Sequence, residues 1–239
     1  QRVFFIHIPK TGGTSIEEWI KNEADITFLI KNTIPEPLIV YPQHLRHTDM
    51  RAILGEKFYD WAFAVVREPY KRLESEYHYR NDPSERTKNT LEFSEWVILS
   101  IHKASENPTY LDNHIRPQSD FLADDVEVFK LEDGLDIVSK KLLEFLKINT
   151  STSIGKKNSS KKSAIVWTDE ALAIANDFYA EDFSHFNYPQ KETHKKYHNI
   201  SRLRKNRAQK IFKTIEDGIH TYDIYDEKTS VKSVGTKEF

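Results

Sequence analysis

Residues 3–15 read VFFIHIPKTGGTS, and this stretch decides how the chain begins to fold. Its first part, residues 3–8, is an apolar run rich in aromatic and β-branched side chains, which is typical of a strand buried in a parallel sheet. Pro9 ends the run, two glycines follow, and Thr14 or Ser15 can cap a helix directly after them. The stretch therefore predicts a strand, a tight turn and a helix.

The same unit recurs further along the chain. Residues 61–66 read WAFAVV and predict a second buried strand, and Pro69 is well placed near the start of a helix from about Tyr70 to Arg80. Strands that alternate with helices predict an α/β fold, in which a mostly parallel sheet is flanked by helices. Further strands are predicted over residues 38–41 and 126–131, helices over 90–104, 135–146, 169–179 and about 200–219, and a long polar loop over 149–163.

The composition limits the class of protein. With 239 residues, of which 30% are charged and 12% aromatic, the chain can form one domain with a substantial core. A formal net charge of −2 argues against a general nucleic-acid-binding protein. Cysteine is absent, which excludes disulfides and thiolate metal sites and fits a reducing cytoplasm. No apolar run is long enough to span a membrane and no signal peptide is visible. The sequence is also compatible with an N-terminal anchor that has been removed.

The turn after the first strand has the features of an anion site. Gly12 and Gly13 expose backbone N–H groups at the positive end of the predicted helix, and Lys10 adds a full charge. The alternative is an ordinary glycine turn with a solvated lysine, but the hydroxyls of Thr11, Thr14 and Ser15 converge on the same turn and favour anion binding. The lysine precedes the glycines, so the turn is not a Walker A loop.

Residues 9–15, PKTGGTS, resemble the 5′-phosphosulfate loop of sulfotransferases that use 3′-phosphoadenosine 5′-phosphosulfate (PAPS). The stretch is especially similar to the branch with the carbohydrate (glycosaminoglycan) 2-O-sulfotransferases and their bacterial relatives. The resemblance implies a P-loop-like three-layer sandwich, with PAPS as co-substrate. It also implies that the backbone of the loop cradles the 5′-phosphate and that Lys10 contacts the leaving oxygen. The loop residues so implied are Lys10, Thr11, Gly12, Gly13, Thr14 and Ser15.

A second motif follows the second strand. Arg67 and Ser75 resemble the family's 3′-phosphate motif, in which an arginine at a strand end and a helical serine hold that phosphate. From the residues alone, Arg67 could instead pair with Glu68 or Glu74. The basic loop at residues 155–160 resembles the loop that closes over the nucleotide, which implies contacts from Lys157 and Asn158, although a charge run is often only a solvated face.

In sulfonate transfer the hydroxyl that receives the sulfonate must lose its proton to a base, and histidine suits that task near neutral pH. Of the ten histidines, His44 matches the position of the family's catalytic histidine, and His47 is its nearest rival. His7, in the first strand, is expected to be a buried hydrogen-bonding residue. A segment with His114 and Gln118 resembles one that lines the acceptor side in the family. No metal is required on this account.

The resemblance covers residues 3–188. Residues 1–189 are therefore expected to form a sulfotransferase domain, and residues 190–239 a C-terminal amphipathic helix with a flexible tail from about Asp226. Asp182, near the end of the domain, is expected to fix a turn.

The expected activity is transfer of a sulfonate from PAPS to a hydroxyl, with a carbohydrate as the implied acceptor. Basic residues between 195 and 207 either recruit an acidic polysaccharide or form a solvated helix face. The alternatives are a P-loop type of nucleotide kinase and a non-catalytic nucleotide-binding interaction protein. The acceptor itself, the oligomeric state and the source remain open.

Overall fold

The structure is a computed structural model that describes residues 1–23, 34, 36–81, 90–149, 152–154 and 165–220. Most of the polar loop predicted over residues 149–163 and the whole tail predicted from about Asp226 lie outside these ranges.

The core of the fold is a parallel sheet of three strands in the order β1-β2-β3. β1 spans Val3–Ile6, β2 spans Trp61–Val66 and β3 spans Glu127–Lys130, so each lies within a predicted strand. Phe5 of β1 pairs with Phe63 of β2. Because the pairing is parallel, β1 and β2 end at the same edge of the sheet, and the turns that follow them meet there.

The residues of β2 alternate between two hydrophobic clusters, one on each face of the sheet. Phe63 and Val65 belong to a cluster that includes buried residues of α1 (Gly13–Ile20) and α5 (Leu135–Leu146), whereas the alternate residues of β2 belong to a cluster on the other face. The sheet is thus covered on both faces, which confirms the predicted α/β fold. The described part of the chain also contains α2 (His47–Leu54), α3 (Pro69–Arg80), α4 (Phe93–Glu106), α6 (Asp169–Phe178), α7 (Ala180–His185) and α8 (Ile200–Glu216).

The strand predicted over residues 38–41 is wrong. The segment is irregular and leads into a short 3-10 helix over Pro42–His44. Val40 is buried in a cluster with Leu45 and Met50, against which Phe4 of β1 packs, but its segment pairs with none of the described strands, and Ile39 is 65% exposed. Apolar residues predict burial, but a strand also needs a neighbour whose backbone it can pair with.

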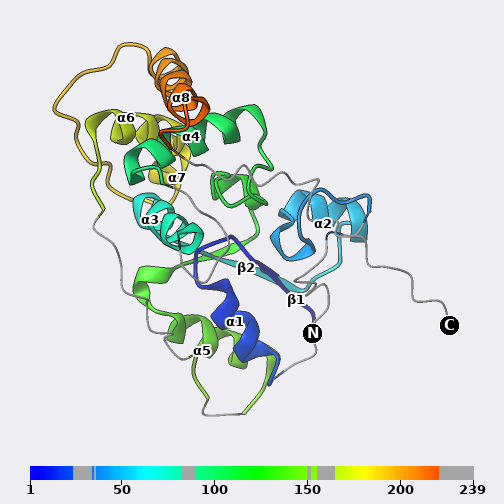
Figure 1. The fold of residues 1–239 in the computed structure, drawn as a ribbon. Coiled ribbons are helices and arrows are strands. Elements are labelled where there is room, and N and C mark those ends of the chain that lie inside the picture. The colour runs from blue at the N-terminus through cyan, green and yellow to red at the C-terminus, as the bar shows by residue number, and fades with distance from the viewer. Residues whose placement is uncertain (24–33, 35, 82–89, 150–151, 155–164, 221–239) are drawn as a thin grey trace.

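The C-terminal helix α8 packs against α4 and α6 (Figure 1). Its residues Ala208 and Ile211 are buried in the same cluster as Trp96 of α4 and Ile174 of α6, which accounts for the predicted amphipathic pattern. None of the described helices is long and apolar enough to cross a membrane. The domain boundary between residues 189 and 190 stays a prediction.

Candidate active site

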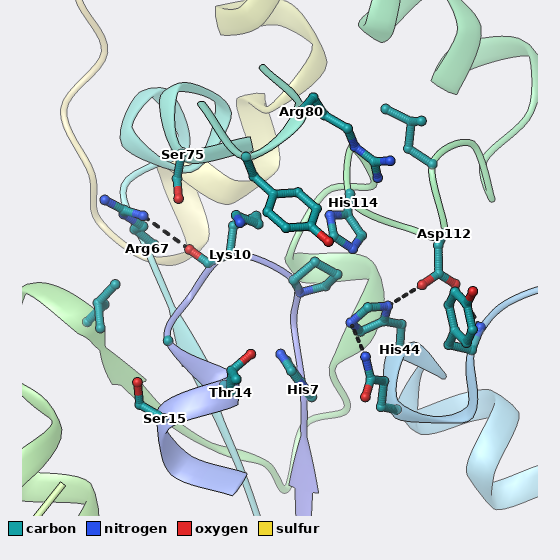
Figure 2. Close-up of a pocket in the computed structure, with 18 of the residues that line it drawn as sticks. His7, Lys10, Thr14, Ser15, His44, Arg67, Ser75, Arg80, Asp112 and His114 are labelled. Carbon is teal, nitrogen blue, oxygen red and sulfur yellow. Dashed lines mark hydrogen bonds and ion pairs between the residues drawn. The ribbon is translucent and has the colours of Figure 1, made fainter. Parts of the chain in front are cut away.

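A pocket of about 510 Å³ opens at the edge where β1 and β2 end (Figure 2). Parallel α/β sheets bind ligands in this position. Thr11 and Gln118 do not line the pocket, and Lys157 and Asn158 lie outside the described residues. The predicted site residues that the pocket brings together are Lys10, Gly12, Gly13, Thr14, Ser15, His44, Arg67, Ser75 and His114.

The turn between β1 and α1 has the backbone of an anion-binding loop. Gly12 has a φ of 92°, a left-handed conformation that side chains disfavour, and directly precedes α1. The first turn of α1 has no acidic residue, so its own side chains do not compensate the positive end of the helix dipole. The capping role predicted for Thr14 or Ser15 is wrong, because Gly12 occupies the cap position and no side chain caps the helix. Both residues line the pocket instead.

Two residues of this loop serve its packing. Thr11 is fully buried, and its Oγ1 donates a hydrogen bond to the Ile8 carbonyl at 2.8 Å, so its hydroxyl is used within the turn and not on a ligand. Gly13 lies against His7, because a Cβ at this position would come within 2.2 Å of the imidazole ring. His7 Nδ1 shares a hydrogen bond with buried Glu17, which agrees with the predicted structural role of His7.

Lys10 brings a cation into the pocket. Its backbone is left-handed, with a φ of 70°, and its carbonyl accepts a hydrogen bond from Arg67 Nη1 at 3.3 Å. The ammonium nitrogen lies 4.1 Å from the centroid of the Tyr79 ring, which is the geometry of a cation–π contact. The turn therefore presents the Lys10 charge beside α3, close to the end of β2.

Arg67 and Ser75 lie on the α3 side of the pocket, as Figure 2 shows. Burial lowers the pKa of the Arg67 guanidinium, and nearby carboxylates oppose that shift. In the described part of the chain Arg67 forms no ion pair within 4.0 Å with Glu68 or Glu74. Glu68 instead caps α3, and Glu74 pairs with Lys71. The partly buried Arg67 charge is therefore available to an anion in the pocket.

Gln118 positions the backbone of Arg67. Its Oε1 accepts the Arg67 N–H at 2.9 Å, and its Nε2 donates to the Arg67 carbonyl at 2.9 Å. Asp182 of α7, which is buried, accepts the backbone N–H groups of Gln118 and Ser119 at 2.9 Å each, which is the turn-fixing role expected of it. The acceptor-side contact predicted for Gln118 is corrected accordingly, because its amide is fully buried in this network.

His44 is held by a carboxylate that sequence reasoning missed. Its Nδ1 makes a close hydrogen bond with Asp112 Oδ2, while Oδ1 accepts the Tyr41 N–H at 2.7 Å. The Gln43 amide nitrogen lies 3.3 Å from His44 Nε2, which fits a ring that carries its proton on Nδ1 and accepts on Nε2. Asp112 and Asn113 both have left-handed backbones, with φ of 56° and 65°. An Asp-Asn pair tolerates that conformation, and this was the available sequence signal.

His114 also has a carboxylate partner. Its Nδ1 bonds to Glu76 Oε2 at 2.7 Å, and Arg80 Nε donates to the other oxygen of Glu76 at 2.7 Å. Burial lowers the pKa of His114 to about 4, although Glu76 acts in the opposite direction. Burial would raise the pKa of Glu76, but His114 and Arg80 hold it well below its usual range. His114 is therefore neutral near pH 7, and its Nε2 is a hydrogen-bond acceptor.

The three imidazoles form a row along the pocket. The ring centroids of His7 and His44 are 5.1 Å apart, and those of His44 and His114 are 5.0 Å apart. His47, the rival base, is only 3% exposed, bonds through Nε2 to the Tyr59 hydroxyl at 2.8 Å and does not line the pocket. The geometry therefore favours His44.

Arg72 connects the two sides of the site. Only 2% exposed, it donates through Nε to the Pro9 carbonyl at 3.0 Å and through its two terminal nitrogens to the carbonyls of Arg116 and His114, at 2.8 and 2.9 Å. One buried side chain thereby fixes the residue before Lys10 relative to the segment that carries His114.

The same side chains include potential metal ligands. Donor atoms of His44, Asp112 and His114 lie within 4.8 Å of one another, and imidazole with carboxylate can bind a transition metal. Here, however, Asp112 and Glu76 each bond to the Nδ1 of one imidazole, which is also how a carboxylate orients a base. That the reaction needs no metal stays a prediction.

Comparison with known proteins supplies the family. Curated proteins with a local match include the NADP isocitrate dehydrogenases of Rickettsia conorii and Rickettsia felis, each 74% identical over 27 residues. The match covers 11% of this chain and only 6% of those relatives, so it says nothing about the fold or the site. No solved structure matches the chain. Residues 1–189 match the model of the sulfotransferase family, and the chain therefore belongs to that family.

Proposed function

We propose that this sulfotransferase moves a sulfonate from PAPS to a hydroxyl of a carbohydrate acceptor. Sulfotransferases generally use PAPS as the co-substrate. The observation that carries the proposal is that one pocket is lined by Lys10, by Arg67 with Ser75, and by His44 with Asp112. Lys10, Arg67 and Ser75 suit the charged groups of PAPS, and His44 with Asp112 suits removal of the proton that the acceptor hydroxyl must lose.

The nucleotide would bind at the edge formed by the ends of β1 and β2. The backbone N–H groups of residues 12–14 and the positive end of α1 suit the 5′-phosphate, and the guanidinium of Arg67 with the Ser75 hydroxyl suits the 3′-phosphate. Gln118, which does not line the pocket, holds the Arg67 backbone in place through two hydrogen bonds. Thr11 contributes through the shape of the turn, because its hydroxyl is bonded to Ile8.

The transfer itself needs charge stabilisation and one base. A bond forms between the acceptor oxygen and sulfur while the bond between sulfur and the bridging oxygen of PAPS breaks. The Lys10 ammonium stabilises the negative charge that develops on that bridging oxygen. His44 Nε2 takes the proton of the hydroxyl, and Asp112 stabilises the imidazolium that results. In this proposal His114 Nε2 accepts a hydrogen bond from the molecule that receives the sulfonate.

The assignment of Arg67 is tested with two nucleotides. Arg67→Ala is expected to weaken binding of 3′-phosphoadenosine 5′-phosphate about ten- to a hundredfold, because it removes a charged hydrogen bond, and to leave binding of adenosine 5′-phosphate unchanged. Calorimetric titration measures both affinities, and a chelator should not change them. Arg51→Ala is the matched control, since Arg51 is half-exposed on α2 and outside the pocket. An equal loss for both nucleotides, or Mg²⁺-dependent ATP binding as in a kinase, contradicts the assignment.

The pH profile of turnover separates His114 from His44. His114→Gln is expected to lower kcat about tenfold by removing an acceptor contact, but to leave the acidic limb of the profile in place. The reason is that the pKa of His114 is about 4, so it stays neutral throughout the range in which an ordinary histidine titrates. A limb that disappears in this variant means that His114, and not His44, is the base.

A further inference from the structure

The side of the pocket next to His44 includes exposed and partly exposed apolar side chains besides the polar groups that contact His44. Ile39, with 65% of its surface exposed, lies two residues before Tyr41, and Leu111 directly precedes Asp112, so the chain holds both near the His44–Asp112 pair. These side chains line the same pocket as the proposed base. An apolar group of a ligand gains affinity when it covers such side chains. The apolar and aromatic residues that line this side of the pocket are Ile34, Ile39, Tyr41 and Leu111.

Among the described residues, the same side offers no net positive charge to an anionic acceptor. In the described part of the chain, the basic side chains that line the pocket are Lys10, Arg67 and Arg80. The Arg80 charge is compensated, because its Nε lies 2.7 Å from the buried carboxylate of Glu76. Asp112 places a carboxylate beside the proposed base. Recognition of a polyanion needs uncompensated cations, and a like charge nearby disfavours it.

The basic residues between 195 and 207 are not at the pocket. They belong largely to α8, which packs against α4 and α6 and is drawn at the top of Figure 1. In the described range 190–220 no residue lines the pocket, and Arg207 pairs with Glu170 at 2.8 Å. The recruitment of an acidic polysaccharide to the site by this segment is therefore not supported.

We infer that the acceptor is an uncharged alcohol that carries an apolar substituent, such as a sugar joined to an alkyl or lipid chain. The inference deepens the proposed function and rests on it in one respect, namely that the reacting hydroxyl lies at His44. The sugar hydroxyl would then face His44 and His114, and the apolar substituent would lie over Ile39 and Leu111. Within the part of the chain that the structure describes, a sulfated or carboxylated glycan would find no uncompensated cation on this side.

A matched set of ligands tests the inference by binding. The protein is saturated with 3′-phosphoadenosine 5′-phosphate and titrated with methyl β-glucoside, hexyl β-glucoside or hexyl β-glucuronide in a calorimeter. Hexyl β-glucoside is expected to bind about tenfold more tightly than the methyl compound, because part of its chain is buried. The glucuronide, which differs in one carboxylate, is expected to bind at least about fivefold more weakly than hexyl β-glucoside.

Two variants locate the effect. Ile39→Ser is expected to reduce the hexyl-to-methyl affinity ratio to about threefold or less, because it removes apolar surface at the pocket. Ile137→Ser is the matched control, since Ile137 is 49% exposed on α5 and does not line the pocket, and the ratio should not change. Equal affinity for the two glucosides, no binding of hexyl β-glucoside, or tighter binding of the glucuronide would overturn the inference. Failure of the nucleotide to bind would instead contradict the proposed function.

Discussion

Lys10→Ala is expected to reduce sulfonate transfer about a thousandfold while the protein remains folded. The bridging oxygen of PAPS gains negative charge as its bond to sulfur breaks, and a preorganised cation at that oxygen lowers the barrier more than a solvated one could. Lys10 is suited to this, because the turn after β1 places its ammonium at the pocket and 4.1 Å from the Tyr79 ring centroid. Single-turnover transfer of labelled sulfonate measures the chemical step directly.

The control for this variant is Lys71→Ala. Lys71 is a lysine of α3 with a side chain 56% exposed, pairs with Glu74 and does not line the pocket, so its loss should leave turnover within about twofold of the original. Thermal unfolding of both variants shows whether the fold is intact. Near-normal transfer by Lys10→Ala would remove Lys10 from the catalytic step.

Much of the fold could be predicted from local patterns. The strand at 61–66 and the helix at 135–146 match β2 and α5, because a continuous apolar run and a helical apolar period each have one obvious structural solution. The strand predicted over residues 38–41 was wrong because Val40 of this segment is buried without pairing with a strand of the sheet. Val40 packs with Leu45 and Met50, and no short-range pattern tells such packing from pairing in a sheet.

In the candidate site, too, the features that are local in sequence could be predicted and the contacts between distant residues could not. The loop at residues 9–15 could be identified because a glycine turn between a strand and a helix is local in sequence. The residues that hold the site together could not. Asp112 is 68 residues from His44, and Glu76 is 38 residues from His114. Gln118 was assigned to the acceptor side, but it instead holds the backbone of Arg67, 51 residues away.

Buried Arg72 illustrates why these contacts matter to function. It contacts carbonyls on both sides of the pocket, at Pro9 and at His114, and so links the residue before Lys10 to the segment that carries His114. In-line transfer depends on such positioning, since reacting atoms must be aligned before the barrier is crossed. Arg72 thus helps to organise the site although it does not itself line the pocket.

His44→Ala is expected to lower turnover about a hundredfold or more while leaving the affinity for 3′-phosphoadenosine 5′-phosphate intact, because it removes the base but no phosphate contact. Asp112→Asn should lower turnover in the same direction, since an amide cannot stabilise the imidazolium as a carboxylate does. His47→Ala is the matched control, because His47 bonds to Tyr59 outside the pocket. Steady-state kinetics with calorimetric nucleotide titration measures both quantities. If His47→Ala abolishes turnover and His44→Ala does not, the base is His47, and the bond between His44 and Asp112 has only a structural role.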